Sequence, residues 1–279
     1  MQLQLRGHTI DCTNRTVVMG IVNVSHDSPI THSIHEPNDA HDYALELVRR
    51  GAAIIDVGAH STSTGARDMT AQEEIERVCP VIAALAAEGI PSSVDTWTPA
   101  VARAAAKAGV GILNDVTGVT DPEMVAVVGE FHLPAIVMHM RGRPKHHHEV
   151  DQHFVDIGAE VQLFMLERAA VLEAAGAGQV WFDPGFGFGK SAQDNLRLIQ
   201  ALPALVSTGY PVLISASRKG FLGELLGRGD RQDVDGLLEA TVAFNTIAAT
   251  NGVHVARVHD VAELADALAI VNAMRARTD

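Results

Sequence analysis

The chain has 279 residues, of which 47% are hydrophobic and 4% are aromatic, and its 21 Lys and Arg against 34 Asp and Glu give a formal net charge of −13. This composition is typical of a folded globular protein and excludes a disordered or collagen-like chain. The acidic balance argues against general nucleic-acid binding, which needs clustered Lys and Arg to neutralise phosphates.

The sequence leads us to expect a cytoplasmic protein that does not enter a membrane. No apolar run approaches the ~18 residues of a membrane span. The first residues, MQLQLRGHTID, lack the basic start and long apolar middle of a signal peptide. The two cysteines, Cys12 and Cys79, lie far apart and outside any CxxC pattern, which indicates a reducing compartment rather than a disulfide framework.

Short apolar runs alternate with longer amphipathic stretches along the whole chain. The runs are rich in Val and Ile without strict alternation, which is typical of parallel strands buried on both faces. The predicted strands span 16–23, 52–58, 91–96, 110–115, 134–139, 179–184, 211–217 and 253–260. The predicted helices span 38–50, 71–89, 98–108, 122–130, 151–175, 193–207, 219–227, 232–250 and 261–276.

These strand–helix units recur about every 33 residues, and eight such units predict a (β/α)8 TIM barrel. A doubly wound open sheet has the same rhythm and stays as the alternative, because the pattern does not show whether the sheet closes. Residues 3–12, LQLRGHTIDC, are a candidate for a small hairpin that plugs the N-terminal end of the barrel. No linker or composition break interrupts the chain, so residues 1–279 are expected to form a single domain.

In such a barrel, the C-terminal ends of the strands and the loops after them form the active face. The residues at these ends are mostly polar, which is costly unless each one meets a partner or a ligand. They are Asn23, Asp56, Asp95, Asn114, Asp115, Met138, His139, Asp183, Ser217, Arg218, Lys219, Arg257 and His259.

Two chemical groups stand out within this set. Asp95, Asn114 and Asp183 end three strands, and such side chains facing one pocket suit a ligand with a row of N–H donors, such as an aminopyrimidinone ring. The last two strands are followed by the cationic side chains Arg218, Lys219, Arg257 and His259. Cations at that place match the usual phosphate location in these barrels, so the sequence predicts a ligand with a flat nitrogen-rich ring and a phosphate tail.

Single acids at strand ends also have plainer explanations. Asp115 before VTG and Asp260 before VAELADAL are candidates for helix N-caps, and Asp56 is a candidate for a buried structural acid. A binding site is favoured because the acids lie early and midway along the barrel and the bases lie late, all on one face.

The glycine-rich segment 183–191, DPGFGFGKS, fits neither the Walker A motif nor the G-x-G-x-x-G pattern. Its glycines instead favour a close approach of the backbone to a ligand, and either Phe186 or Phe188 is a candidate to cover a flat ring. The 14 histidines include several near the predicted active face, but no HExxH or comparable spacing occurs, so a zinc site is not favoured.

Eight motifs follow one another along almost the whole chain: MGIVNVSHDS, IIDVGAHST, SVDTW, NDVTG, MHMRGRPK, FDPGFGFGK, SRKGFLG and RVHDV. Their order and spacing resemble the dihydropteroate synthase family of the pterin-binding superfamily. The resemblance implies a TIM-barrel transferase of folate biosynthesis, commonly a dimer. Its substrates would be 6-hydroxymethyl-7,8-dihydropterin diphosphate and 4-aminobenzoate, and diphosphate would be released.

The resemblance also implies roles for residues that match the motifs. Asp95, Asn114, Asp183 and Lys219 would hold the pterin, with Met138 packing on it, and Thr62 would lie near its reactive side. Asn23, Arg257 and His259 would bind the diphosphate with Mg²⁺ near Asn23, and Ser217 would lie near the aminobenzoate carboxylate. Asp95, Asp183 and Lys219 would be the catalytic residues, because the two acids can stabilise the positive charge that develops when diphosphate leaves.

Two loops depart from the family pattern. The first usually reads NVTPDSFSDGG but is NVSHDSPITHS at 23–33, and the second usually reads GGESTRPG but is GAHSTSTG at 58–65. In the family these loops close over the aminobenzoate and the diphosphate, so we expect weaker inhibition by sulfonamides, which mimic aminobenzoate. A working synthase is the leading hypothesis, and the alternatives are a paralogue with weak activity or another acceptor and a non-catalytic pterin-binding protein.

Overall fold

The structure, a computed structural model, describes residues 1–25, 37–62, 67–228 and 234–276. Its strands are β1 (Gln2–Leu5), β2 (His8–Asp11), β3 (Val17–Asn23), β4 (Ala52–Gly58), β5 (Ser92–Asp95), β6 (Ile112–Asp115), β7 (Ala135–Met138), β8 (Val180–Asp183), β9 (Leu213–Ile214) and β10 (Val255–Val258). Its α-helices are α1 (Pro37–Arg49), α2 (Ala71–Ala87), α3 (Pro99–Ala108), α4 (Pro122–Phe131), α5 (Ile157–Ala175), α6 (Ala192–Val206), α7 (Gly220–Leu225), α8 (Leu238–Thr250) and α9 (Val261–Arg275). Two 3₁₀ turns are η2 (His147–Glu149) and η3 (Asp235–Leu237).

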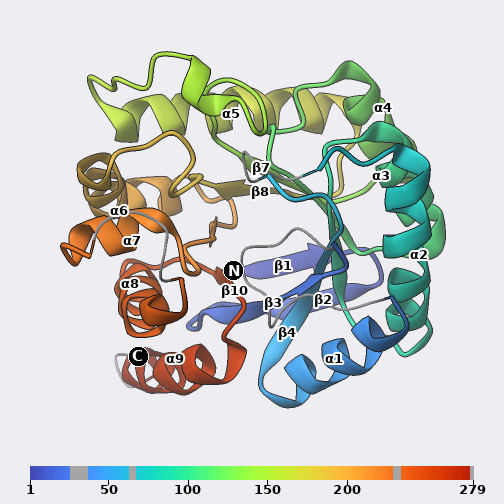
Figure 1. Cartoon of the computed structure of the whole chain (residues 1–279), viewed down its shortest axis with the longest axis horizontal. Helices are drawn as coiled ribbons and strands as arrows, with labels where there is room; N and C mark the ends of the chain where they lie inside the picture. The colour runs from blue at the N-terminus through green and yellow to red at the C-terminus, as the bar shows by residue number, and fades with distance from the viewer. Residues whose placement is uncertain (26–36, 63–66, 229–233, 277–279) are drawn as a thin grey trace.

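Strands β3 to β10 form one eight-stranded parallel sheet in the order β8-β7-β6-β5-β4-β3-β10-β9. The two ends of this order meet, because Phe182 forms a parallel bridge with Val212 and its N–H donates to the Pro211 carbonyl at 2.8 Å. The helices surround the strands as an outer ring (Figure 1). The prediction of a (β/α)8 barrel is therefore confirmed, and the open doubly wound sheet is excluded.

The N-terminal hairpin closes one end of the barrel, as the sequence suggested. Strands β1 and β2 pair antiparallel, and their arrows lie inside the ring of helices (Figure 1). Leu3 and Leu5 are buried, and they pack in one cluster with Met19, Ile54 and Trp181 from the barrel strands. Because the hairpin fills this end with apolar side chains, the polar residues at the opposite strand ends are left as the accessible interior.

Three predicted elements differ most from the structure in their boundaries. The helix expected from residue 151 begins at Ile157, because the Asp156 side chain caps it by accepting the Ala159 N–H at 3.0 Å. Helix α8 begins at Leu238 after the turn η3, whose central Gly236 disfavours an α-helix. The seventh strand of the barrel, β9, is confined to two residues. Within the described part of the chain, no helix is both long and apolar enough to cross a membrane.

Candidate active site

A pocket opens at the C-terminal ends of the barrel strands, where the sequence places the active face. Every residue that the sequence analysis assigned to the site lines it: Asn23, Thr62, Asp95, Asn114, Met138, Asp183, Phe188, Ser217, Lys219, Arg257 and His259. Three other strand-end residues, Asp56, Asp115 and His139, lie outside this lining as far as the described residues define it. The barrel thus gathers into one cavity side chains that lie more than two hundred positions apart in the sequence.

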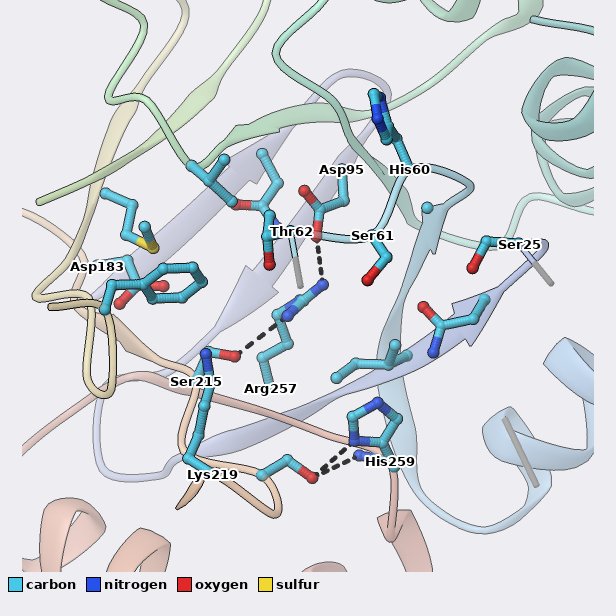
Figure 2. Close-up of a pocket in the computed structure, with 18 of the residues that line it drawn as sticks. Ser25, His60, Ser61, Thr62, Asp95, Asp183, Ser215, Lys219, Arg257 and His259 are labelled. Atoms are coloured by element: carbon cyan, nitrogen blue, oxygen red, sulfur yellow. Dashed lines mark hydrogen bonds and ion pairs between the residues drawn. The ribbon is translucent and has the colours of Figure 1, made fainter. Parts of the chain in front are cut away.

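Arg257, at the third position of β10, sits in the centre of the pocket between acidic groups. Its Nε donates to Asp56 at 2.6 Å. Its Nη2 donates to Asp95 at 2.5 Å and its Nη1 to the Ser215 hydroxyl at 3.1 Å (Figure 2). The guanidinium therefore contacts the acidic half of the pocket, and the diphosphate role that the resemblance implies for it stays a prediction. Its flat face stays suited to contact with a planar ring.

Asp56 is the buried structural acid that the sequence analysis considered. It is 0% exposed, and it accepts hydrogen bonds from Arg257, from the Ser93 hydroxyl and from the Asn114 amide nitrogen at 3.4 Å. One carboxylate therefore orients two residues of the pocket lining. Its position as the single acid inside the apolar run AAIIDVG was the available sequence signal.

The two acids that line the pocket, Asp95 and Asp183, sit in an environment that resists ionisation. Burial raises the pKa of Asp95 from its ordinary value of 3.8 to about 7, Arg257 lowers it in part, and Asp56, Asp115 and Glu74 raise it further. Burial also raises the pKa of Asp183. The Gly185 N–H, which donates to this carboxylate at 2.8 Å, and nearby cations lower it in part. The Asp95 Oδ1 atom is buried and has no hydrogen-bond partner among the described residues, so it is an acceptor available to a ligand.

Apolar side chains and one cation form another wall of the pocket. Met138 and Phe188 pack in one cluster with Val116. The Lys219 ammonium lies 3.8 Å from the Phe188 ring centroid, a cation–π contact. Phe186 is fully buried and packs edge-on against Phe244, so Phe188 is the phenylalanine that faces the site.

The glycine loop after β8 is held by Lys190, a residue that the sequence analysis did not assign. The Lys190 ammonium is buried and donates to the carbonyls of Gly185 at 2.8 Å, His139 at 3.0 Å and Phe188 at 3.3 Å. Gly185 has φ +70°, and a Cβ there would lie 2.1 Å from the His139 carbonyl oxygen, so glycine is required. Lys190 thus ties the β8 loop to the end of β7.

Replacing Lys190 with methionine is expected to lower the free energy of unfolding by about 3 kcal/mol, because three buried carbonyls lose their donor. Urea denaturation would measure the change. Lys107→Met, at an exposed position in the last turn of α3, is the matched control and should change stability by less than about 0.5 kcal/mol. Equal stability of the two variants would contradict the structural role of Lys190.

The opposite side of the pocket carries neutral polar groups and one histidine. The Ser217 hydroxyl lies 2.8 Å from His259 Nδ1 and accepts the His259 backbone N–H at 3.2 Å. Asn23 ends β3 and faces the same cavity as Thr62. Among the described residues, no group of three His, Cys, Asp or Glu side chains is arranged to hold a metal ion.

The altered loops are described only in part. His26 to Ser33 of the first loop and residues 63–66 of the second lie outside the described residues. At the start of the second loop, the His60 ring contacts the Trp97 ring in a tilted arrangement, with a centroid distance of 4.4 Å and an interplanar angle of 33°. Burial lowers the pKa of His60, which favours the neutral imidazole beside the pocket.

Comparisons with known proteins agree with this geometry. The model of the pterin-binding enzyme family matches residues 19–259. A dihydropteroate synthase of Escherichia coli strain K12 is 38% identical over 277 residues, which cover 98% of this chain and 96% of that protein. The crystal structure of dihydropteroate synthase from Thermus thermophilus in complex with 4-aminobenzoate has a TM-score of 0.86 at 37% identity, covering 98% of this chain and 100% of that one.

The dihydropteroate synthase from Xanthomonas albilineans in complex with 7,8-dihydropteroate has a TM-score of 0.81 at 36% identity, covering 99% of this chain and 98% of that one. These similarities extend over nearly the full length of each protein and include the strand ends that form the pocket. The chain belongs to the dihydropteroate synthase family of pterin-binding enzymes.

Proposed function

We propose that this chain is a dihydropteroate synthase that joins 4-aminobenzoate to 6-hydroxymethyl-7,8-dihydropterin diphosphate and releases diphosphate. Full-length similarity to synthases, two of whose structures hold 4-aminobenzoate or 7,8-dihydropteroate, supports this reaction. The observation that carries it for this chain is one pocket that gathers the buried acids Asp95 and Asp183, the cations Arg257 and Lys219, and a polar rim.

The ring of the pterin fits the acidic half of the pocket. Asp95 Oδ1 offers an acceptor without a partner among the described residues, and Asp183 supplies a second buried carboxylate. An ionised carboxylate accepts adjacent N–H groups strongly in a dry site, as the edge of an aminopyrimidinone requires. Met138 and Phe188 would cover the faces of the ring, and Asn114 would complete its edge.

The diphosphate tail fits the rim formed by Asn23 and His259, with Ser217 left for the aminobenzoate carboxylate and Thr62 beside the reactive carbon. Mg²⁺ usually binds few protein groups and takes its other ligands from phosphate oxygens and water. The Asn23 carboxamide at the end of β3 lines the pocket and offers one oxygen ligand, so Asn23 would hold the ion. The ion would neutralise charge on the departing diphosphate.

The chemistry then requires little beyond placement. The bond between the pterin CH₂ and the diphosphate oxygen breaks, and its electron pair leaves with the diphosphate. Asp95 and Asp183 stabilise the positive charge that spreads from the CH₂ into the ring. The arylamine nitrogen forms the new C–N bond and loses one proton to solvent. Lys219, held over Phe188, orients the ring, and the pocket positions the amine for attack.

Ligand affinity is expected to depend on pH through Asp95. Because its pKa is raised to about 7 and the ionised form accepts the ring N–H groups, the Kd for an aminopyrimidinone ligand should rise about tenfold for each pH unit below 7. Calorimetry between pH 5.5 and 8.5 would measure this, and Asp95→Asn should bind weakly with a flat profile. A flat profile in the unaltered protein would contradict the assignment.

The same titration has the opposite effect on stability. Asp95 has a folded pKa above its ordinary 3.8, so its protonated form contributes stability that is complete below pH ~4 and is lost as the pH rises through about 7. Within that window, the Asp95 contribution to stability falls while ligand binding improves.

Diphosphate release measured with and without 4-aminobenzoate tests the function. Release that depends on the amine and yields 7,8-dihydropteroate supports the synthase. Release with other arylamines and not with 4-aminobenzoate would indicate a paralogue with another acceptor. Binding of the pterin diphosphate by calorimetry without release in any case would indicate a binding protein.

The proposal also includes the domain organisation, the oligomeric state and the cellular location of the protein. A single domain over 1–279 is supported by the one closed barrel. A homodimer is supported by the family resemblance and by exposed apolar side chains on α8 and α9, namely Ile247, Ile270 and Met274. A cytoplasmic location is supported by the two unpaired cysteines, Cys12 and Cys79. Light scattering of the purified protein would test the dimer.

A further inference from the structure

Arg218 adopts a backbone conformation that is unfavourable for its residue type. It follows β9 and lies between Ser217 and Lys219, and all three residues line the pocket. Its φ is +51°, in the left-handed region where a Cβ crowds the backbone. Such strain persists when the surrounding contacts compensate for it, and it is concentrated at functional sites.

The contacts that hold Arg218 in place are extensive. Its Nε and Nη2 donate to the two carboxylate oxygens of Asp260, each at 2.8 Å, and both side chains are less than a tenth exposed. Its Nη1 donates to the Val234 carbonyl at 3.0 Å, and its backbone N–H donates to the Thr241 hydroxyl at 2.9 Å. This is a buried bidentate ion pair, the geometry in which arginine and a carboxylate interact most strongly.

Asp260 pairs with Arg218 and does not make the helix-capping hydrogen bond that its position favours. It occupies the N-cap position of α9, where an aspartate normally accepts a backbone N–H of the first turn. The sequence analysis expected that role, but Asp260 makes no side-chain cap bond, because both of its oxygens face Arg218. The ion pair therefore joins a residue with a strained backbone, Arg218, to a helix N-terminus that lacks its side-chain cap. Both features are locally unfavourable, and both accompany the same contact.

The pair joins two loops that contribute to different halves of the proposed site. Ser217 precedes Arg218, and His259 precedes Asp260. These two neighbours are themselves joined by the Ser217 Oγ to His259 Nδ1 contact of 2.8 Å and by the His259 N–H donating to Ser217 Oγ (Figure 2 shows both as dashed lines at His259). Lys219, on the other side of Arg218, lies over Phe188 on the ring-facing wall.

We propose that Arg218 and Asp260 are positioning residues that fix Lys219 relative to His259, so that the ring and the diphosphate of one substrate are held at the same time. The inference rests on the proposed function for its kinetic consequence. Arg218 and Asp260 act through their neighbours. A displacement of about 1 Å between groups that hold a reacting molecule lowers the rate about 100-fold.

The double variant Arg218→Met/Asp260→Ser separates positioning from stability. Removing both charges together leaves no unpaired buried ion, and serine supplies the missing helix cap. We expect the thermal midpoint to stay near that of the unaltered protein, whereas kcat/KM falls about 100-fold with a higher KM for the pterin diphosphate. A stable double variant with kcat/KM within about twofold of the unaltered protein would overturn the proposal.

Two further variants keep the test decisive if the double variant folds poorly. Arg218→Lys keeps the positive charge but cannot donate to both Asp260 oxygens in the planar, two-bond geometry of arginine. We expect about a tenfold loss of kcat/KM with the fold retained. Arg275→Met is the matched control, because Arg275 lies at the closed end of the barrel, where it contacts Thr16 and the Ala249 carbonyl. It should lower stability without changing the KM for either substrate. Unchanged kinetics in Arg218→Lys would count against the clamp formed by Arg218 and Asp260.

A readout without substrates distinguishes this inference from the proposed function. The ring ¹⁵N signals of His259 in the free protein should shift or broaden in Arg218→Met/Asp260→Ser and stay unchanged in Arg275→Met. If the unaltered protein shows no turnover but the His259 signals respond in this way, the clamp stands and the proposed function has failed. Unchanged His259 signals in a folded double variant would overturn the clamp.

Discussion

Replacement of Asp183 by asparagine is expected to lower kcat by about a thousandfold, with a smaller effect on the stability of the fold. Asp183 ends β8, is 3% exposed, and holds the Gly185 N–H with one carboxylate oxygen. Asparagine retains the size and one acceptor oxygen, so the loop can keep its hydrogen bond. In the proposed complex, it removes the negative charge that would face the ring when diphosphate departs. Its amide NH2 group would also face the N–H donors of the ring, where the carboxylate would accept hydrogen bonds from them.

The charge of Asp183 has a large effect because its surroundings contain little water. Burial raises its pKa, which means that the ionised form is poorly solvated and interacts strongly with any nearby positive charge. A cation that forms on the substrate is such a charge. The transition state therefore gains more from Asp183 than the ground state does, and the loss should fall on kcat more than on KM.

Single-turnover and steady-state kinetics of Asp183→Asn would measure the effect. Asp194→Asn is the matched control, because Asp194 is also buried but binds Ser191 and Arg197 in the first turn of α6, outside the pocket. We expect that control to keep kcat within about threefold of the unaltered protein. A turnover for Asp183→Asn similar to that of Asp194→Asn would refute the electrostatic role.

The strand ends of the barrel could be predicted from the sequence, and the reason is local. Strand β3 (Val17–Asn23) was expected at 16–23, and β8 (Val180–Asp183) at 179–184, because apolar runs that end in a polar residue mark a buried strand and its exit from the core. Since all parallel strands end on one face, placing the ends also places the pocket residues. Closure of the sheet depends on the pairing of Phe182 with Val212, which no local pattern shows.

Contacts inside the pocket could not be predicted in the same way. The guanidinium of Arg257 reaches Asp56 across 201 sequence positions and Asp95 across 162, and these partners depend on how the strands are staggered. The sequence therefore placed Arg257 in the pocket but did not show its contacts with Asp56 and Asp95, and its role toward the diphosphate stays a prediction. Lys190 was missed for a different reason, because its partners are backbone carbonyls, which any residue type carries.

Asp260 shows how a correct local rule can be overridden. An aspartate before VAELADAL is a favourable N-cap, and the structure does place Asp260 at that position. The Arg218 guanidinium, in a loop 42 positions away, competes for the same carboxylate oxygens. The charge-assisted pair with Arg218 forms in place of the helix cap because it is the stronger interaction. Asp115, the other expected cap, instead accepts the Thr117 N–H and hydroxyl in a turn, and Asp121 caps α4.

Replacement of Arg257 by methionine is expected to lower the free energy of unfolding by about 4 kcal/mol and to reduce kcat/KM by at least about a thousandfold. The stability loss follows from the carboxylates that the guanidinium neutralises. Asp56 is fully buried, and among the described residues its remaining hydrogen-bond donors without Arg257 are the neutral side chains of Ser93 and Asn114. The activity loss follows because the same cation shapes the ring-facing half of the pocket and donates directly to Asp95.

The sign of the accompanying pH effect is determined by the same contacts. Arg257 lowers the pKa of Asp95, so its removal should move that pKa above about 7 and shift the pH needed for ligand binding upward. Arg257→Lys keeps a positive charge but cannot reach Asp56, Asp95 and Ser215 together, so it should retain part of the stability and little of the activity.

The double variant Asp56→Asn/Arg257→Met tests whether the stability loss comes from an unpaired charge. Removing both members should recover at least about half of the lost free energy of unfolding while activity stays low. Arg168→Met is the matched control, because the Arg168 guanidinium donates to the backbone carbonyls of Gly118 and Val119 rather than to a carboxylate. If Arg257→Met and Arg168→Met lost equal stability, the charge of Asp56 would not explain the effect, and Arg257 would act through packing alone.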